Sequence, residues 1–334
     1  MATENTSLLA GKLAVSSAAS SSGLSQDDGP RLPQTIAHRG YKAAFPENSM
    51  GAFRGAVEIG AHAIETDLHL SKDGVVVLSH DASLKRCFGV DKKVAECDWS
   101  YLSTLKTLRE PQQGIPRLLD LLIYLGKPEQ EHIWLLLDIK PDDDADDLLV
   151  RTANTIALSP TTRAWSERIV LGAWNANYVD RCRQYFPNFK IAFIGFNLVF
   201  ARRYLGQPDM DFNLMQPILP GPYGNHFMKA IKKAGQNLYV WTVNEEYWME
   251  WSIRKQVDGV ITDDPKLFLE VCDRWAARVE SLVKRGGSSR GGRTAVARLY
   301  AWAFACQLLS LFVTAIAWRR FTSIDKRKQG LVRV

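Results

Sequence analysis

Residues 63–70 read AIETDLHL and residues 132–140 read HIWLLLDIK, and both runs are predicted to be strands. Each carries two ionisable side chains two residues apart: Glu65 and Asp67 in the first, Asp138 and Lys140 in the second. Alternate residues of a strand point to one face. Each pair is therefore expected on a single face, which in a closed barrel is the interior or its mouth.

The same alternation of short β-branched runs and helical patterns extends from residue 35 to about residue 283. Further strands are predicted at Thr35–Arg39, Arg168–Trp174, Lys190–Phe196, Phe212–Pro217, Leu238–Asn244 and Gly259–Thr262, with a short β excursion at Val75–His80. Helices are predicted at Glu47–Ile59, Leu118–Leu125, Ala145–Leu158, Asn177–Tyr185, His226–Ala234 and Glu245–Lys255. Strands and helices that alternate in this number predict an α/β fold, a (β/α)8 TIM barrel over residues 35–283. A doubly wound open sheet is the alternative, but it would more naturally carry a glycine-rich phosphate loop, and none is present.

The segments outside the barrel have a different composition. Residues 1–34 hold few large apolar side chains and are expected to be disordered, without a secretory signal. A basic Gly/Ser-rich linker at 284–298 leads to Leu299–Trp318, which contains no charge and is followed by a basic tail at 319–334. An uncharged helix of that length spans roughly 30 Å, the thickness of a bilayer core, so a C-terminal transmembrane helix is predicted. A helix lying in the interface and a ninth helix packed on the barrel are the alternatives.

The net charge of +6 comes from the C-terminal segment and not from the barrel. Residues 284–334 hold eleven Lys and Arg and one acid, so this segment carries +10 and residues 1–283 carry −4. Such a distribution argues against nucleic acid as a partner and favours an anionic membrane surface. The five cysteines include no CxxC pair, so neither a disulfide framework nor a zinc site is expected.

The candidate chemistry lies in residues 38–140. Buried carboxylates such as Glu65, Asp67 and Asp138 repel one another unless a cation joins them, and an all-oxygen donor set suits Mg²⁺ or Ca²⁺. His38 lies near the end of the first predicted strand and His80 ends the β excursion, so two imidazoles could act as base and acid.

Other side chains near these motifs have less certain roles. Arg39 offers a planar fork to phosphate oxygens, and Asp81 could orient the His80 ring or cap a turn. His62 and His69 are interpreted as structural. The acidic run Asp142–Asp147 is interpreted as the solvated start of a helix.

These motifs resemble the glycerophosphodiester phosphodiesterase family. The resemblance rests on His38-Arg39-Gly40, Pro46-Glu47-Asn48, Glu65-Thr66-Asp67, Asp73-Gly74 and His80-Asp81, and it continues at 137–140, 240–244 and 259–265. With the apolar tail included, the chain looks most like the fungal phosphatidylglycerol phospholipase C branch.

The resemblance implies a role for each matching residue. It makes His38 and His80 the catalytic pair, and Glu65, Asp67 and Asp138 the ligands of a divalent cation. Arg39 and Lys140 would bind phosphate, and Trp241 would contact the substrate. Most family members carry Glu where this chain has Asp138, so the carboxylate of this ligand is set back by one methylene group.

The expected reaction is metal-assisted cleavage of a phosphodiester with a glycerol headgroup. Cleavage of phosphatidylglycerol to diacylglycerol and glycerol phosphate is the leading hypothesis. A general glycerophosphodiester phosphodiesterase or a lysophospholipase D is the alternative, and a non-enzymatic membrane scaffold is the reading from a different class. The catalytic domain is expected to face the cytosol, anchored to the endoplasmic reticulum, a lipid droplet or the mitochondrial outer membrane.

Overall fold

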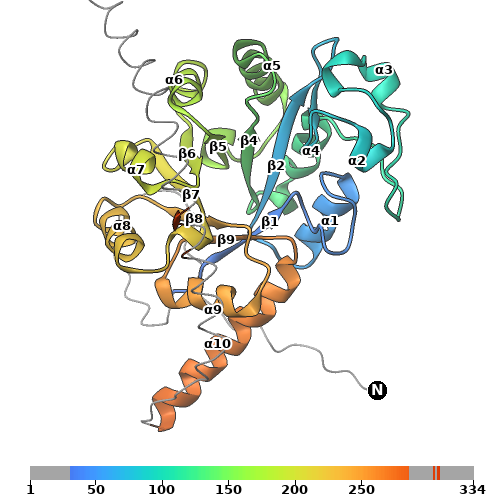
Figure 1. Ribbon diagram of the computed structural model, residues 1–334. Coiled ribbons are helices and arrows are strands. Elements are labelled where there is room, and N and C mark those ends of the chain that lie inside the picture. Colours follow the sequence, from blue (N-terminus) through green and yellow to red (C-terminus); the bar gives the residue numbers. More distant parts are fainter. Residues whose placement is uncertain (1–30, 286–303, 305–306, 309–334) are drawn as a thin grey trace, which may run out of the picture.

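The computed structural model describes residues 31–285 together with residues 304, 307 and 308 (Figure 1). Apart from a few residues at its borders, the N-terminal segment that was expected to be disordered lies outside this range. The linker, the predicted membrane helix Leu299–Trp318 and the basic tail also lie outside it, except for Lys284, Arg285 and the three residues named. Among the described residues, no helix is both long enough and apolar enough to cross a bilayer.

Eight parallel strands close into a barrel, because β1 pairs with β2 on one side and with β9 on the other. The predicted (β/α)8 barrel is thereby confirmed. Its strands are β1 (Gln34–His38), β2 (Ala63–Leu70), β4 (Trp134–Ile139), β5 (Ile169–Ala173), β6 (Lys190–Gly195), β7 (Met210–Met215), β8 (Leu238–Trp241) and β9 (Gly259–Thr262). The predicted β excursion is β3 (Val76–Leu78), which pairs antiparallel with the far end of β2.

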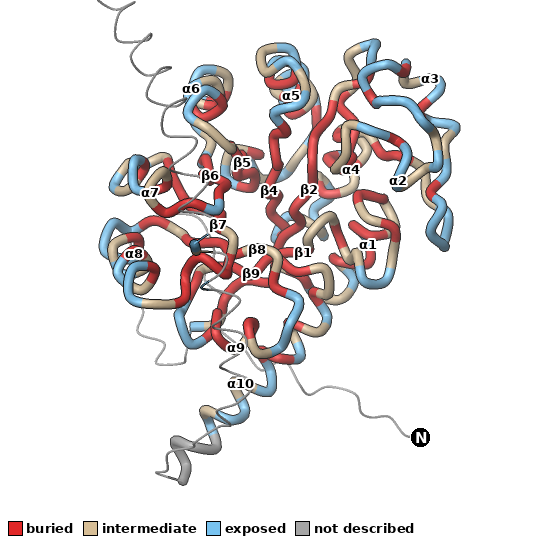
Figure 2. Tube along the Cα trace, in the orientation of Figure 1, coloured by how far each residue is buried: buried red, intermediate tan, exposed pale blue. Residues whose placement is uncertain are grey.

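Helices surround the barrel, and Figure 2 shows the strands buried and the outward helix faces exposed. The helices are α1 (Met50–Glu58), α2 (Lys85–Phe88), α3 (Trp99–Leu102), α4 (Leu118–Leu125), α5 (Ala145–Leu158), α6 (Ala176–Tyr185), α7 (Leu198–Ala201), α8 (Pro222–Lys233), α9 (Glu246–Lys255) and α10 (Pro265–Arg285). The predicted helix signals act as expected at two places. Ser49 caps α1 by accepting a hydrogen bond from Ala52 N, and Gly235 follows α8 with a φ of +69°.

Several strand ends differ from the prediction, and two of the differences have local reasons. Strand β1 ends at His38 and not at Arg39, because Arg39 adopts a left-handed φ of 57° that takes the chain out of the sheet. Strand β7 begins at Met210, two residues earlier than predicted. The sequence pattern disfavours Asp211 as a strand residue, but its carboxylate is hydrogen-bonded by Asn237.

The interior of the barrel is filled by one apolar layer. It consists of Ile36, Ala63, Trp134, Leu136, Val170, Ala192, Tyr239 and Ile261, with Trp241 packed against it. The inward residues one step further along β1, β2 and β4 are His38, Glu65 and Asp138. In the sheet register His38 pairs with Glu65, and Asp67 pairs with Asp138. The strands therefore change from an apolar floor to a charged layer at their carboxyl ends.

The segment between β3 and α4, which no predicted element covers, builds a small core of its own. Val77, Leu84, Val94, Cys97, Leu102 and Ile115 form this cluster. It carries α2 and α3 beside the mouth of the barrel (Figure 1).

Candidate active site

The predicted metal ligands Glu65, Asp67 and Asp138 come together at the mouth. One carboxylate oxygen from each lies within 4.8 Å of the others, and the three residues are 4%, 1% and 5% exposed. Two cations share this space. Lys140 Nζ lies 2.8 Å from Asp67 Oδ1 and 2.6 Å from Asp138 Oδ2, and Arg39 Nε lies 3.4 Å from Asp67 Oδ2.

Neutral donors hold each carboxylate in place. Arg39 N donates to Glu65 Oε2 at 2.9 Å, and Asn48 Nδ2 donates to Asp67 Oδ2 at 2.8 Å. Trp174 Nε1 donates to Asp138 Oδ1 at 2.7 Å. Both oxygens of Asp138 thus accept a hydrogen bond already, because Lys140 bonds the other one. Each oxygen of Asp138 therefore keeps a single lone pair for a metal.

The electrostatics of the cluster fit a divalent cation. Burial, and then the charges of Asp67 and Asp138, raise the pKa of Glu65 well above its ordinary value. Burial also acts on Asp67, but the charges of Lys140 and Arg39 outweigh it and lower the pKa of Asp67. A further positive charge would favour the ionised form of all three carboxylates, and the buried space offers oxygen donors for it. This donor set suits Mg²⁺ or Ca²⁺.

His38 lies beside this cluster, with Nε2 4.0 Å from Glu65 Oε2 and Nδ1 2.6 Å from Asp263 Oδ1. Burial lowers the pKa of His38, and the hydrogen bond with Asp263 offsets part of that shift. An ionised carboxylate can only accept a hydrogen bond. Asp263 therefore fixes the tautomer with hydrogen on Nδ1 and leaves Nε2 as an acceptor on the side of the carboxylates.

Asp263 is a site residue that the sequence analysis did not single out. It directly follows β9, and Lys42 Nζ at 3.2 Å and Asn244 Nδ2 at 3.0 Å hold its other oxygen. The available signal was its position, because polar residues at the carboxyl ends of barrel strands are candidates for function.

His80 has a partner of the same kind. Its Nδ1 lies 2.7 Å from Asp81 Oδ1, so Asp81 contacts the imidazole, which was one of the two roles considered for it. His69, interpreted as structural, is 1% exposed and bridges Asp143 and the backbone carbonyl of His80, at 2.7 and 3.3 Å. Asp143 therefore supports the site and is not merely part of a solvated helix start.

A chain of ion pairs connects the two sides of the site. Arg39 Nη1 donates to Glu47 Oε1 at 2.9 Å. Arg86 on α2 donates to both oxygens of Glu47 and, through Nε, to Asp81 Oδ2 at 2.6 Å. From the sequence, Glu47 was expected at a helix start and in the family motif, and no role was predicted for Arg86.

Two tryptophans border the mouth. Trp241 ends β8 and packs edge-on against Trp174, with ring centroids 5.8 Å apart, and its Nε1 donates to the carbonyl of Asn213 at 3.0 Å. Because Trp174 also donates to Asp138, the predicted contact residue Trp241 is one ring away from the carboxylate cluster.

Comparisons with known proteins agree on one family. The model for the "Glycerophosphoryl diester phosphodiesterase family" matches residues 38–267. A glycerophosphodiester phosphodiesterase of Caldanaerobacter subterraneus is 26% identical over 271 residues, covering 75% of this chain and 98% of the relative. A lysophospholipase D of Mus musculus is 27% identical over 287 residues, covering 74% of this chain and 88% of the relative.

A solved structure shares the fold. An Oleispira antarctica phosphodiesterase in complex with the product sn-glycerol-3-phosphate superposes with a TM-score of 0.64 at 22% identity, covering 72% of this chain and 97% of that one. At this identity the likeness carries the fold alone.

Proposed function

Because the chain belongs to the glycerophosphoryl diester phosphodiesterase family, and is therefore a phosphoric diester hydrolase, we propose that it cleaves glycerophosphodiesters with a bound divalent cation. The observation that carries the proposal is the arrangement of His38 and His80 around three buried carboxylates within 4.8 Å of one another. The cation would be held by Glu65, Asp67 and Asp138. When bound, it would supply Lewis-acid stabilisation of the negative charge on the phosphate.

The histidines divide the proton transfers between them. Burial lowers the pKa of His38, which favours the neutral ring, and its Nε2 is free to accept a proton from the attacking oxygen. His80, whose side chain is 34% exposed, donates a proton to the leaving oxygen. Its exposure allows the proton to be replaced from solvent after each turnover.

Arg39 and Lys140 neutralise the phosphate. An ammonium group has three donors, and Lys140 uses two of them for Asp67 and Asp138, so one remains. The Trp174–Trp241 pair offers an aromatic surface beside these charges for the apolar or choline-like part of a substrate.

The relatives favour a general glycerophosphodiesterase or lysophospholipase D over the phosphatidylglycerol phospholipase C that was the leading hypothesis from sequence. The two readings differ in which phosphorus–oxygen bond breaks. The phospholipase C reading keeps the support of the apolar run Leu299–Trp318 and stays the second candidate.

Product analysis by mass spectrometry decides between them. Glycerophosphocholine, lysophosphatidylcholine and phosphatidylglycerol are each incubated with the full chain and Mg²⁺ or Ca²⁺. Glycerol phosphate from glycerophosphocholine, with or without lysophosphatidic acid from lysophosphatidylcholine, supports the main proposal. Diacylglycerol from phosphatidylglycerol as the dominant product selects the second candidate, and no product from any substrate refutes both.

The apolar composition of Leu299–Trp318 supports a membrane-anchored location, and we place the barrel in the cytosol as part of this proposal. Gln307, one of the described residues of this run, donates to the carbonyls of Ile218 and Pro220 in the β7–α8 connection. This contact favours the alternative of a helix packed on the barrel. Removal of residues 287–334 is expected to preserve hydrolysis of glycerophosphocholine and to lower attack on lipid in vesicles, because a tether raises the effective substrate concentration. Equal vesicle activity in both proteins would contradict the anchor.

A further inference from the structure

Arg86 on α2 donates hydrogen bonds to two carboxylates at once. Its Nη1 and Nη2 donate to Glu47 Oε2 and Oε1 at 2.9 and 2.6 Å, and its Nε donates to Asp81 Oδ2 at 2.6 Å. Three donors of one planar group therefore bind two different carboxylates. Neither carboxylate belongs to the helix that carries Arg86, since Glu47 precedes α1 and Asp81 follows β3.

Each of these carboxylates has a second contact that leads into the active site. Asp81 Oδ1 lies 2.7 Å from His80 Nδ1, and Glu47 Oε1 accepts from Arg39 Nη1 at 2.9 Å. The guanidinium of Arg86 is thus the centre of a continuous path from the imidazole of His80 to the guanidinium of Arg39. The first is the proposed acid and the second the proposed phosphate ligand.

We infer that Arg86 is a positioning residue that holds His80 and Arg39 at a fixed separation across the phosphate. This inference rests on the proposed function. Through Asp81 it fixes the orientation of the His80 ring, and through Glu47 it keeps the Arg39 side chain extended over the metal-binding carboxylates. Arg86 itself touches no reacting atom.

Packing alone does not set the orientation of His80. The His80 side chain is 34% exposed, and its Nδ1 lies 2.7 Å from Asp81 Oδ1. A partly exposed ring depends on its hydrogen bonds for its position. Loss of Arg86 would leave Asp81 free to rotate, and the imidazole would rotate with it.

The charge state of the path is consistent with this role. The hydrogen bonds to Glu47 and then Asp81 raise the pKa of Arg86, so its charge is permanent. Burial raises the pKa of Asp81, but its bonds to Arg86 and His80 outweigh this effect and bring the pKa to about 2. Both partners therefore remain ionised across the range in which such an enzyme would work.

The test compares Arg86→Ala with Arg86→Lys and with the control Arg183→Ala. Arg183 binds Asp209 through two nitrogens at 2.6 and 3.0 Å and is 38% exposed against 49% for Arg86, but Asp209 lies just before β7, at the other end of the barrel. With glycerophosphocholine as substrate, kcat of Arg86→Ala should fall about 10- to 100-fold. Arg86→Lys should recover part of the loss, and Arg183→Ala should stay within about twofold of wild type.

A double variant separates positioning from a general structural role. If Arg86 acts through Asp81, then Asp81→Asn combined with Arg86→Ala should be no worse than about threefold below the poorer single variant. A kcat of Arg86→Ala near the wild-type value, or losses that multiply in the double variant, would overturn the inference.

Should Arg86→Ala fail to fold, Arg86→Lys takes its place in the same cycle. A wild-type protein without turnover refutes the proposed function and this inference with it, whereas an active wild type with an unaffected Arg86→Ala refutes the inference alone.

Discussion

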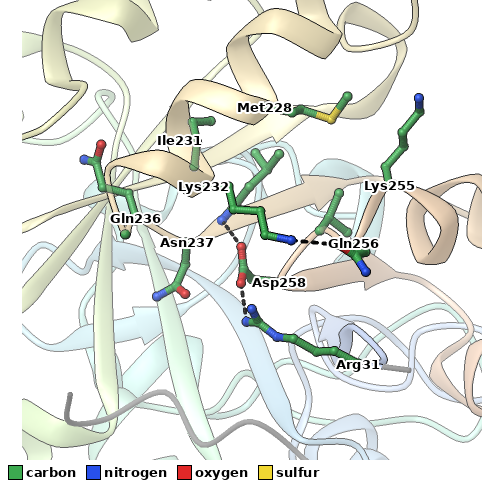
Figure 3. A pocket seen from close by; sticks show the side chains of 12 residues that line it. Arg31, Met228, Ile231, Lys232, Gln236, Asn237, Lys255, Gln256 and Asp258 are labelled. Atoms are coloured by element: carbon green, nitrogen blue, oxygen red, sulfur yellow. Dashed lines mark hydrogen bonds and ion pairs between the residues drawn. The ribbon is translucent and has the colours of Figure 1, made fainter. Parts of the chain in front are cut away.

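The two ends of the barrel both bury charged side chains, but they differ in whether the carboxylates converge. At the carboxyl end Glu65, Asp67 and Asp138 converge within 4.8 Å. At the amino end the carboxylates of Asp211 and Asp258 each accept a hydrogen bond from a backbone amide, and Asp258 also pairs with Arg31. Figure 3 shows part of this end, a pocket of about 160 Å³ in which Arg31 pairs with Asp258.

Hydrogen bonds at the amino end go mainly to the backbone. Arg168, 1% exposed, donates to the carbonyls of Leu125, Gln130 and Ile133 at 2.7–3.0 Å. Asp258 accepts from Leu238 N at 2.8 Å, and Asp211 accepts from Asn237 N at 2.9 Å. These contacts tie loops to strand beginnings, which is a structural task.

The difference shows that a buried charge alone does not identify a functional site. Burial raises the pKa of Asp211 at the amino end just as it raises the pKa of Glu65 at the mouth. Among the described residues, only the mouth brings one oxygen from each of three carboxylates within 4.8 Å of one another. Convergence of like charges, and not the shift of a single pKa, is therefore the observation that points to a metal and to catalysis.

Removal of the metal should have the largest effect on turnover, and changes at the carboxyl and amino ends of the barrel should differ most in this test. EDTA should abolish turnover, and Mg²⁺ or Ca²⁺ should restore it. Glu65→Gln should lose both turnover and the thermal stabilisation by the cation, which amounts to about 2.7 kcal/mol at a concentration of 100 Kd. The amino-end control Asp211→Asn should keep both. Full activity in chelator, measured by release of glycerol phosphate, would contradict the metal site.

Replacement of the histidines should have the next largest effect. His38→Ala and His80→Ala should each lower kcat by roughly 10²–10⁴-fold with little change in melting temperature. His62, which accepts a hydrogen bond from Thr35 N at 2.9 Å, is the amino-end control. His62→Ala should cost stability, because a buried backbone donor loses its partner, and should leave kcat of the folded protein near wild type. Near-normal turnover in His38→Ala or His80→Ala would remove that residue from the mechanism.

Asp263→Asn should shift the pH profile as well as the rate. Burial lowers the pKa of His38, and the negative charge of Asp263 opposes that shift. Without this charge the pKa of His38 falls further, so His38 stays neutral to lower pH. The acidic limb of kcat/KM should therefore move to lower pH, while kcat falls about 10-fold because the ring loses its orienting partner. An acidic limb that stays in place or moves to higher pH would show that His38 is not the group that must be deprotonated.

Arg168→Met should have the smallest effect on activity and a clear effect on stability. The change removes the Arg168 donors from the carbonyls of Leu125 and Ile133, whereas Gln130 O keeps its bond from Ile133 N, so the free energy of unfolding should fall by about 3 kcal/mol. Urea unfolding measures the loss of stability, and kcat at low temperature measures the activity of the folded protein. A loss of kcat in the folded protein comparable to that of Glu65→Gln would mean that the amino end takes part in function after all.

The sequence by itself determined the barrel and the residues of its charged layer. Strand periodicity is local, so the spacing of Glu65 and Asp67, or of Asp138 and Lys140, already placed each pair on one face. The runs Ala63–Leu70 and Gly259–Thr262 coincide with β2 and β9 because their apolar pattern and their turn signals agree.

Only the tertiary structure decided which distant residues complete the site. His38 and Asp263 are 225 residues apart in sequence, and Arg86 reaches Glu47 across 39 residues. No periodicity encodes such pairs, since they arise where the barrel closes β9 against β1 and where the small core around Leu84 sets α2 beside the mouth. The chain specifies the face of each strand locally, and the closure of the sheet selects the partners that meet on it.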